Sequence, residues 1–511
     1  MTGFRQSMAW LHGWAGLLVG WLLYFVFVTG TIGYFNPEID HWMRPEEPVA
    51  AGLPSAEHMA TLGLARLAAK APGAQSWSIQ LPGARGASLL DLDWRGGPSK
   101  ARGTLALDPN TGQPLAKPVR DTGGGRALYV MHYELRYMPD TWGIWIVGVC
   151  SVAMLLAIVT GIIAHKKIFR DFFTFRPNKK QRSWLDGHNL VSVVTLPFCL
   201  MITYSGLVFF DYQYVFAGPR ILYGAGQEAR FYEELSPRDP PHQVTTGQPA
   251  ALAPIGPILD QARRAWGPDQ VSRIGVALPG DAAARITLQR RPGSRISRGQ
   301  AETLVFAGAT GAVLTSARPA PEPISAFRAA LLGLHEGLFA NGVLRWLYFL
   351  SGVLGTAMIG TGLVLWTVKR RQKLGAAGQA GIELQVIERL NAGVIVGLPI
   401  AVAAYFWANR LIPAHVETRA AWEIHVLFLT LAAALTYSAC RPVERSWREL
   451  CAVASLAFAA LPFVNLATTD RHLGVSLPAG DWVLAGFDLC MLATGAVFAV
   501  LSAPRRRGAA A

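Results

Sequence analysis

Eight apolar runs, each about 20 residues long, constrain what this chain can fold into more than any other feature of its sequence. Helices of that length cross the roughly 30 Å hydrocarbon core of a bilayer. The 511-residue chain is also 51% hydrophobic, more than a soluble protein of this size carries. We therefore expect a polytopic α-helical membrane protein with about eight transmembrane helices. The runs cover residues 10–35, 142–164, 188–210, 343–367, 392–411, 422–440, 449–467 and 482–502.

Basic residues follow every second apolar run, and this alternation predicts the orientation of the chain. Since basic loops stay in the cytoplasm, both termini are expected there, with residues 36–141 and 211–341 on the opposite side. The formal net charge of +14 is then explained by topology, and nucleic-acid binding is not expected. The first run is too long for the apolar core of a signal peptide and is expected to remain as a helix. The basic residues are Lys166, Lys167, Arg170, Arg176, Lys179, Lys180, Arg182, Lys369, Arg370, Arg371, Lys373, Arg441, Arg445, Arg448, Arg505, Arg506 and Arg507.

The chain repeats one plan twice, as helix, small α+β unit, helix. In each repeat the α+β unit is predicted to hold one helix, three short strands and a glycine-containing turn. The turn segments LALDPNTGQPL and LVFAGATGAVL align without a gap. Parallel repeats of this kind imply a pseudo-two-fold axis along the membrane normal. The expected helices are 55–71 and 255–266, and the expected strands are 76–81, 88–94, 103–107, 272–278, 285–290 and 303–306.

This repeat also gives the expected domain boundaries. The last four spans have no matching α+β insert and are interpreted as an appended bundle. The predicted domains are a first transmembrane helix at 1–35, a first α+β domain at 36–141, two transmembrane helices with a basic cytoplasmic loop at 142–210, a second α+β domain at 211–341, a transmembrane helix at 342–368, a cytoplasmic linker at 369–390 and the four-helix bundle at 391–511.

Four histidines occupy matching places in the two repeats. His12 and His188 stand at the mouths of their apolar runs, each 18 residues before a glycine that follows Thr or Ser. His132 and His335 precede the tryptophans of the following runs by 10 and 11 residues. The axis pairs His12 with His188 near the cytoplasmic face, and His132 with His335 near the outer face. Two histidines per layer suit bis-imidazole ligation of haem iron in a duplicated four-helix core. A structural zinc site would need four ligands, usually with thiolates.

Small residues next to His12 and His188 leave room for a flat macrocycle. Gly16 and Gly20 follow His12 at helical spacing, and Ser192 takes the first of these places after His188. Small residues allow close approach inside a membrane bundle. In the alternative interpretation the glycines serve helix packing and the histidines cap helix ends.

His165 breaks the symmetry, because Trp366 stands at its equivalent place in the second repeat. Three interpretations are open. His165 replaces His12 or His188 as a ligand, it binds a haem propionate, or it joins the basic cytoplasmic cluster.

The sequence carries no Walker loop and no strand–GxGxxG–helix unit for a nucleotide. Electrons that cross the protein are therefore expected from membrane quinol or from a separate cytoplasmic reductase. With no CxxCH motif, any haem is expected to be noncovalently bound.

The His12 and His188 segments, the paired α+β segments and the motif GIIAHKKIFRDFFTFRPNKKQRSWLDGHN at 161–189 resemble the PepSY-associated transmembrane family. Within this family, the chain looks most like inner-membrane siderophore reductases of the ferrioxamine-reductase type. The likeness covers residues 1 to about 370 and extends loosely over the last four helices. It implies two b-type haems held by histidines, two PepSY-like periplasmic domains and a place in the bacterial inner membrane. It also implies an oxidoreductase that reduces ferric siderophores, with hydroxamates as the expected class, for iron uptake.

Ferric siderophores fit this chemistry, because their hard oxygen donors hold Fe(III) far better than Fe(II). One electron delivered at the outer side would therefore release iron without hydrolysing the siderophore. Aromatic side chains there also serve as membrane-interface anchors. The expected docking region comprises Tyr129, Tyr133, Glu134, Tyr137, Glu336 and Phe339.

Three other functions compete with this interpretation. The first is a dihaem cytochrome for another periplasmic acceptor, which an acceptor screen would distinguish. The second is a non-redox PepSY membrane protein that binds a peptidase, which predicts no pigment. The third is a siderophore or iron transporter, although the four core helices lack a Gly/Pro-broken pair beyond Pro197.

Overall fold

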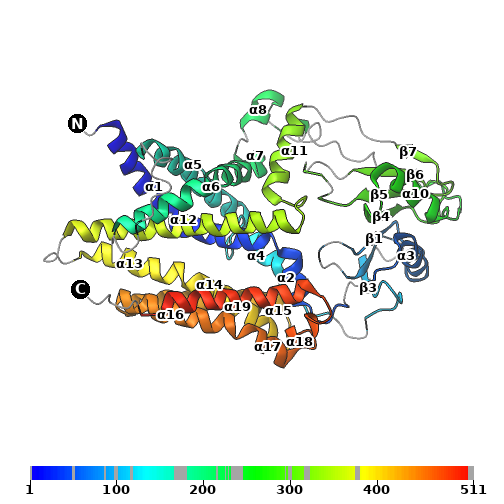
Figure 1. Ribbon diagram of the computed structural model, residues 1–511. Helices are drawn as coiled ribbons and strands as arrows, with labels where there is room; N and C mark the ends of the chain where they lie inside the picture. Colours follow the sequence, from blue (N-terminus) through cyan, green and yellow to red (C-terminus); the bar gives the residue numbers. More distant parts are fainter. Residues whose placement is uncertain are drawn as a thin grey trace. The chain divides into compact units, whose positions relative to one another are not determined.

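The computed structural model describes two units, a helical unit and a sheet unit. The helical unit comprises residues 1–45, 120–210 and 342–511, and the sheet unit comprises residues 46–119 and 211–341 (Figure 1). The described residues are 3–48, 52–83, 85, 88–96, 102–115, 119–165, 176, 181–214, 217–224, 226–227, 230–231, 245–293, 295–296, 302–315, 323–374 and 380–504.

Within these residues the helical unit has eight segments long and apolar enough to cross a membrane, so the chain is a multi-pass helical membrane protein. All eight overlap the predicted runs. Short helices α2 (Asn36–Met43), α4 (Gly124–Met131) and α18 (Leu473–Ser476) lie between them. The spans are α1 (Phe4–Gly33), α5 (Asp140–Ala164), α6 (Gln181–Phe209), α12 (Gly342–Leu374), the Ile382–Leu411 segment, α15 (Arg419–Cys440), the Val443–Thr468 segment and α19 (Trp482–Ser502).

Two of the spans are each built from two consecutive helices. The Ile382–Leu411 segment comprises α13 (Ile382–Ile395) and α14 (Gly397–Leu411), and begins ten residues before the predicted run. Pro399 has no N–H to donate to the Ile395 carbonyl. The Tyr24 hydroxyl donates to that carbonyl instead, at 2.9 Å. Likewise, Pro462 stands in the first turn of α17 (Leu461–Thr468), directly after α16 (Val443–Ala459).

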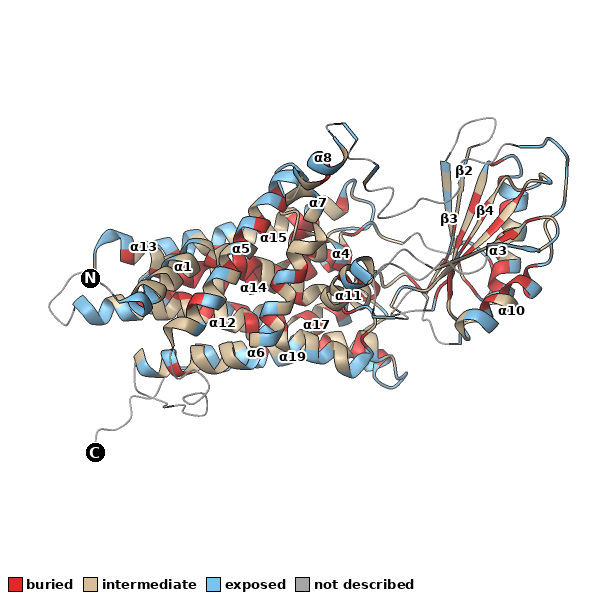
Figure 2. Ribbon diagram, turned by 90° about the horizontal axis from the view of Figure 1, so that it is seen from above, coloured by how far each residue is buried: buried red, intermediate tan, exposed pale blue. Residues whose placement is uncertain are grey.

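The four C-terminal spans share a core with the first repeat. Trp21 Nε1 donates to Asn391 Oδ1 at 2.9 Å, and the Tyr405 hydroxyl donates to the Gly124 carbonyl at 2.8 Å. Buried residues gather in the interior of the helical unit around α1 and α14 (Figure 2). The C-terminal segment, interpreted from the sequence as an appended bundle, therefore shares a core with the first repeat in this unit. Its shared core includes Tyr24, Trp42, Leu128, Tyr405, Phe458 and Leu484.

The described strands of the sheet unit form one seven-stranded antiparallel sheet in the order β3-β2-β1-β4-β5-β6-β7. Helices α3 (Ala56–Lys70) and α10 (Ile255–Trp266) lie together against the sheet, and their apolar sides share its core (Figure 2). The remaining described helices of this unit are α7 (Asp211–Tyr214), α8 (Ala217–Tyr223) and α11 (Pro323–Glu336). The strands are β1 (Ser76–Gln80), β2 (Leu90–Arg95), β3 (Arg102–Leu107), β4 (Val271–Ala277), β5 (Arg285–Arg290), β6 (Thr303–Ala307) and β7 (Val313–Thr315).

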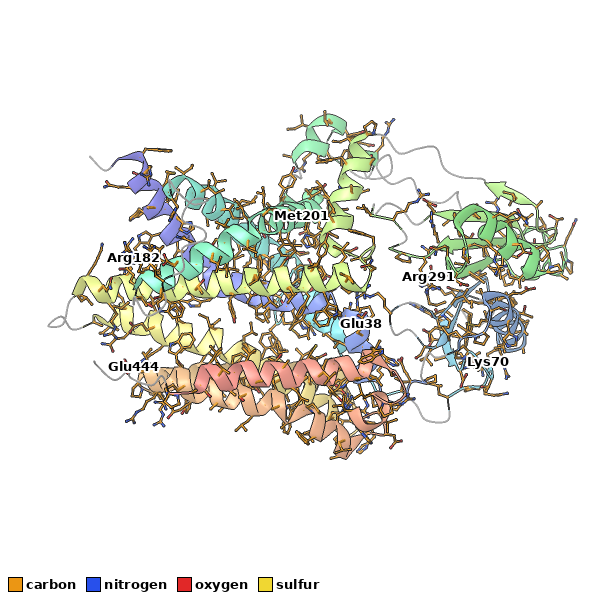
Figure 3. The ribbon with its side chains drawn as sticks, viewed as in Figure 1. Glu38, Lys70, Arg182, Met201, Arg291 and Glu444 are labelled. Atoms are coloured by element: carbon orange, nitrogen blue, oxygen red, sulfur yellow. The ribbon has the colours of Figure 1, made fainter. Side chains whose placement is uncertain are left out.

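The sheet corrects the prediction of two separate α+β domains. β1 from the first repeat pairs with β4 from the second, and Ile79 lies opposite Ile274. Pairing these strands removes two exposed edges and merges two small cores into one. Arg291, labelled in Figure 3, joins the halves by donating to the carbonyls of Pro82 and Val271 at 3.2 and 3.1 Å. The first boundary also moves, because residues 36–45 and 120–141 belong to the helical unit.

Candidate functional site

Four helices of the helical unit position the first histidine pair. α1 packs against α5 and α12, and α6 packs against the same two helices, so α1 and α6 hold equivalent places (Figure 1). His12 lies in the N-terminal part of α1 and His188 in that of α6. Their ring centroids are 6.3 Å apart, with an angle of 59° between the ring planes. The two imidazoles that the repeat pairs therefore lie next to each other.

The surroundings of the two rings match each other. His12 Nδ1 is 2.8 Å from the Ala157 carbonyl of α5, and His188 Nδ1 is 3.0 Å from the Met358 carbonyl of α12. Each carbonyl oxygen accepts the Nδ1 proton of a neutral imidazole. This hydrogen bond fixes the tautomer and leaves the Nε2 lone pair available to a metal.

Two glycines let the rings lie close to these helices. A Cβ at Gly161 would come within 3.0 Å of the His12 ring, and one at Gly362 within 3.1 Å of the His188 ring. Each glycine stands four residues after the carbonyl that the same ring contacts. The Thr-Gly pairs of α5 and α12 thus have the same role in both repeats.

The spacing of the rings fits a metal ion bound between them. With metal–imidazole bonds of about 2 Å, the ring centroids of two opposite ligands lie about 6 Å apart, close to the 6.3 Å found for His12 and His188. Among the described residues, no group of three or more His, Cys, Asp or Glu side chains could hold a metal ion. Two imidazoles alone suit haem iron, whose other four ligands come from the macrocycle.

The small residues near His12 and His188 differ in whether they leave space beside the rings. A Cβ at Gly16 would meet no atom within 4 Å, so this position leaves room beside the ring. A Cβ at Gly20 would come within 2.6 Å of Leu363, which makes Gly20 a helix-packing residue. The Ser192 hydroxyl donates to the His188 carbonyl at 2.6 Å. Gly16 alone of the three has the surroundings that the macrocycle hypothesis requires.

His165 lies beside the pair rather than within it. It follows the last residue of α5, and its Nε2 is 3.0 Å from Asn189 Nδ2. Its Nδ1 is buried and has no hydrogen-bond partner among the described residues. The neighbouring basic residues Lys166, Lys167, Arg170, Lys179 and Lys180 lie outside the described residues, whereas Arg176 forms a 2.9 Å ion pair with Asp186.

His132 has surroundings like those of the first pair. It follows α4, its Nδ1 contacts the Tyr129 carbonyl, and its ring lies against Gly30, where a Cβ would come within 3.6 Å. The glycine of each of three Thr-Gly pairs, at 29–30, 160–161 and 361–362, therefore lies against a histidine ring. Burial lowers the pKa of His132 to about 4, which keeps the imidazole in the neutral form that binds metals.

The second predicted pair is divided between the two units. His335 lies in the last turn of α11 in the sheet unit, whereas His132 belongs to the helical unit. The pairing of His132 with His335 therefore stays a prediction.

The residues predicted for substrate docking are divided in the same way. Tyr133 lies edge-on to His132, with centroids 5.0 Å apart, and the Glu134 carbonyl closely approaches Gly143. Tyr137 is 64% exposed and its hydroxyl lies 2.7 Å from His425 Nδ1 of α15, a partner that the sequence did not suggest. Tyr129 lies in α4, with its ring centroid 5.1 Å from that of His132. The remaining docking residues, Glu336 and Phe339, belong to the sheet unit.

A buried polar network, which sequence reasoning missed, joins the C-terminal helices to residues 120–125. Arg419 and Glu423 of α15 form an ion pair with both side chains fully buried. Glu423 also accepts hydrogen bonds from Thr122 Oγ1 at 2.6 Å, the Gly123 N–H at 3.0 Å and Asn409 Nδ2 at 2.8 Å. The available signal was the spacing of an arginine and a glutamate four residues apart at the start of an apolar run.

The network continues through a second arginine. Arg410 Nε donates to Asn465 Oδ1 at 2.9 Å, and the guanidinium carbon lies 3.7 Å from the centre of the Trp42 ring. Asp488 is fully buried and accepts from Trp42 Nε1 at 3.0 Å and from Asn465 Nδ2 at 3.1 Å. Buried charges in a membrane protein need such partners, and this part of the network links α14, α17 and α19 to α2.

Together the eight apolar spans define a multi-pass helical membrane protein. A model of the PepSY-associated TM region matches residues 9–369. The chain belongs to this PepSY-associated transmembrane family, since the match covers most of its length. No curated protein matches the chain.

Proposed function

We propose that this protein is an inner-membrane dihaem b-type reductase that passes electrons across the membrane to ferric siderophores. The observation that carries the proposal is the equivalent placement of His12 and His188, whose rings lie 6.3 Å apart with Nδ1 at a backbone carbonyl. A haem held there supplies one-electron transfer between ferric and ferrous iron.

In the inner layer, His12 and His188 would hold the cofactor through Nε2. The carbonyls of Ala157 and Met358 accept from each Nδ1 and so keep these nitrogens protonated. Gly16 makes room for the macrocycle. In the outer layer we propose His132 and His335 as the equivalent ligands.

The proposed substrate is a ferric siderophore in the periplasm, with hydroxamates as the expected class. One electron converts each Fe(III) to Fe(II), which the oxygen donors of the siderophore release. Tyr129, Tyr133, Glu134, Tyr137, Glu336 and Phe339 are the proposed docking residues. A membrane quinol gives up two electrons and two protons, and therefore serves two ferric siderophores. A cytoplasmic reductase is the other proposed donor.

An absorption spectrum of the purified full-length chain tests the cofactor. We expect a b-type spectrum that dithionite shifts to its reduced form, and two haems per chain in a pyridine haemochrome assay. Protein that is folded and free of haem would rule out the redox function and favour peptidase binding.

A stopped-flow acceptor screen tests the substrate. Chemically reduced protein is mixed in turn with a ferric hydroxamate, a ferric catecholate, ferric citrate and a non-iron dye. Reoxidation fastest with a siderophore supports the proposal. Equal rates with all four would favour a cytochrome with another acceptor.

A further inference from the structure

The surroundings of the His12–His188 pair depart from two-fold symmetry at one pair of positions. His165 stands four residues after Gly161 on the α5 side, and Trp366 stands four residues after Gly362 on the α12 side. Each position lies one helical turn beyond the glycine against which a ligand ring lies. A group bound between the two imidazoles therefore meets different chemistry at α5 and at α12.

On the α5 side, the unusual group is a buried donor. Since the Asn189 amide donates to His165 Nε2, a neutral His165 carries its proton on Nδ1. That atom is buried without a hydrogen-bond partner among the described residues. Buried polar atoms of this kind are uncommon and call for an acceptor. Asn189 also follows the ligand His188 directly in the chain, so the donor lies near the pair.

On the α12 side, the unusual group is a cation held on aromatic rings. The guanidinium carbon of Arg370 lies 3.2 Å from the centre of the Trp366 ring and 5.3 Å from that of Trp14. Trp14 and Trp366 meet edge to face, 5.8 Å apart. A Cβ at Gly13, the residue after His12, would lie 4.0 Å from Trp366. The stacked arginine is thus held close to the ligand helix α1, in a geometry that suits a carboxylate.

We propose that His165, oriented by Asn189, binds one propionate of the inner haem and that Arg370, oriented by Trp366, binds the other. Both propionates of haem b leave the same edge of the macrocycle, and His165 and Arg370 both lie toward the C-terminal ends of their helices, α5 and α12. The inference rests on the proposed function, because it needs a haem between His12 and His188.

A thermodynamic cycle between the protein and the propionates tests this assignment. The full-length apoprotein, with the outer site removed by His132→Ala, is titrated with haem b and with its dimethyl ester, which has no carboxylate charge. We expect the ester to bind about tenfold or more weakly than haem b. His165→Ala and Arg370→Ala should each shrink that difference several-fold, whereas Arg441→Ala, at a half-exposed arginine elsewhere, should leave it unchanged.

A conservative variant gives a second readout. His165→Gln retains an N–H donor, so its difference in affinity between haem b and the ester should stay closer to that of the parent than the difference in His165→Ala does.

The outcomes separate this inference from the proposed function. Equal ester penalties in the parent and in both single variants would overturn the propionate assignment while the haem still binds. A parent chain that is folded and binds no haem would instead refute the proposed function itself.

Discussion

At the residue scale, the proposed function depends most directly on the His12–His188 pair. Replacing either histidine with alanine removes one axial ligand, so we expect haem content to fall by about half as the inner haem is lost. Pyridine haemochrome assays on purified protein measure this. His58→Ala is the matched control, because His58 lies exposed in α3 of the sheet unit. Full haem content in both His12→Ala and His188→Ala would show that the pair is not a haem site.

The glycines that lie against these rings allow a second prediction. The methyl group of Gly161→Ala would lie 3.0 Å from the His12 ring, and that of Gly362→Ala 3.1 Å from the His188 ring. We expect both variants to alter the low-spin haem spectrum to the same degree, because the two contacts are equivalent. Gly486→Ala in α19 is the control, since a Cβ there meets nothing within 4 Å. A change in one variant and none in the other would contradict the symmetric site.

The sequence was sufficient to predict the His12–His188 pair because the repeat turns spacing along the chain into position across an axis. It was not sufficient for the partners of these histidines. The partners are the backbone carbonyls of Ala157 and Met358, and any residue type at these positions would offer the same carbonyl. Similarly, the contact of Tyr137 with His425 joins residues 288 positions apart that have no counterpart in the repeat.

At the element scale, the buried Arg419–Glu423 pair determines how α15 packs on the loop before α4. Removing either partner leaves an unpaired buried charge, which costs about 3–5 kcal/mol of stability. We therefore expect Arg419→Ala and Glu423→Ala each to lower the melting temperature markedly in detergent. The double variant should lose less than the sum of the two single losses. Arg441→Ala is the control, because the Arg441–Glu449 pair is partly exposed and should contribute little. Additive losses would indicate that the pair is not coupled.

Elements were easier to predict from the sequence than their association. All six strands expected from the sequence are present, whereas β7, at three residues, was not predicted. The β1–β4 pairing was not predictable, because alternating residues on a strand are the same whether its edge is exposed or paired. Likewise, Pro399 marks the break between α13 and α14 in the sequence, but the Tyr24 hydroxyl that donates to the free Ile395 carbonyl comes from α1, far away in the sequence.

At the scale of the whole molecule, the charge pattern predicts the orientation of the chain in the membrane. This orientation gives the direction of the proposed electron flow. A phosphatase reporter fused after Gly112, in the sheet unit, should be active in the periplasm, and one fused after Leu374 should be inactive. A cytoplasmic fluorescent reporter at the same two sites provides the control and should give the opposite pattern. Equal signals at both sites would overturn the topology and with it the proposed periplasmic reduction.

The two histidine layers should have separable roles in the whole protein. If His132 and His335 hold an outer haem, His132→Ala and His335→Ala should each remove that haem while the inner one remains reducible from the cytoplasmic side. Ferric siderophore reduction should then fall to the background rate, because one haem cannot easily serve both faces of a core about 30 Å thick. His12→Ala and His188→Ala should show the reverse: the outer haem stays, and artificial reductants added outside restore activity. Reduced-minus-oxidised spectra and siderophore reduction, measured in the same membranes, distinguish these patterns. Full haem content and full activity in both His132→Ala and His335→Ala would eliminate the outer site.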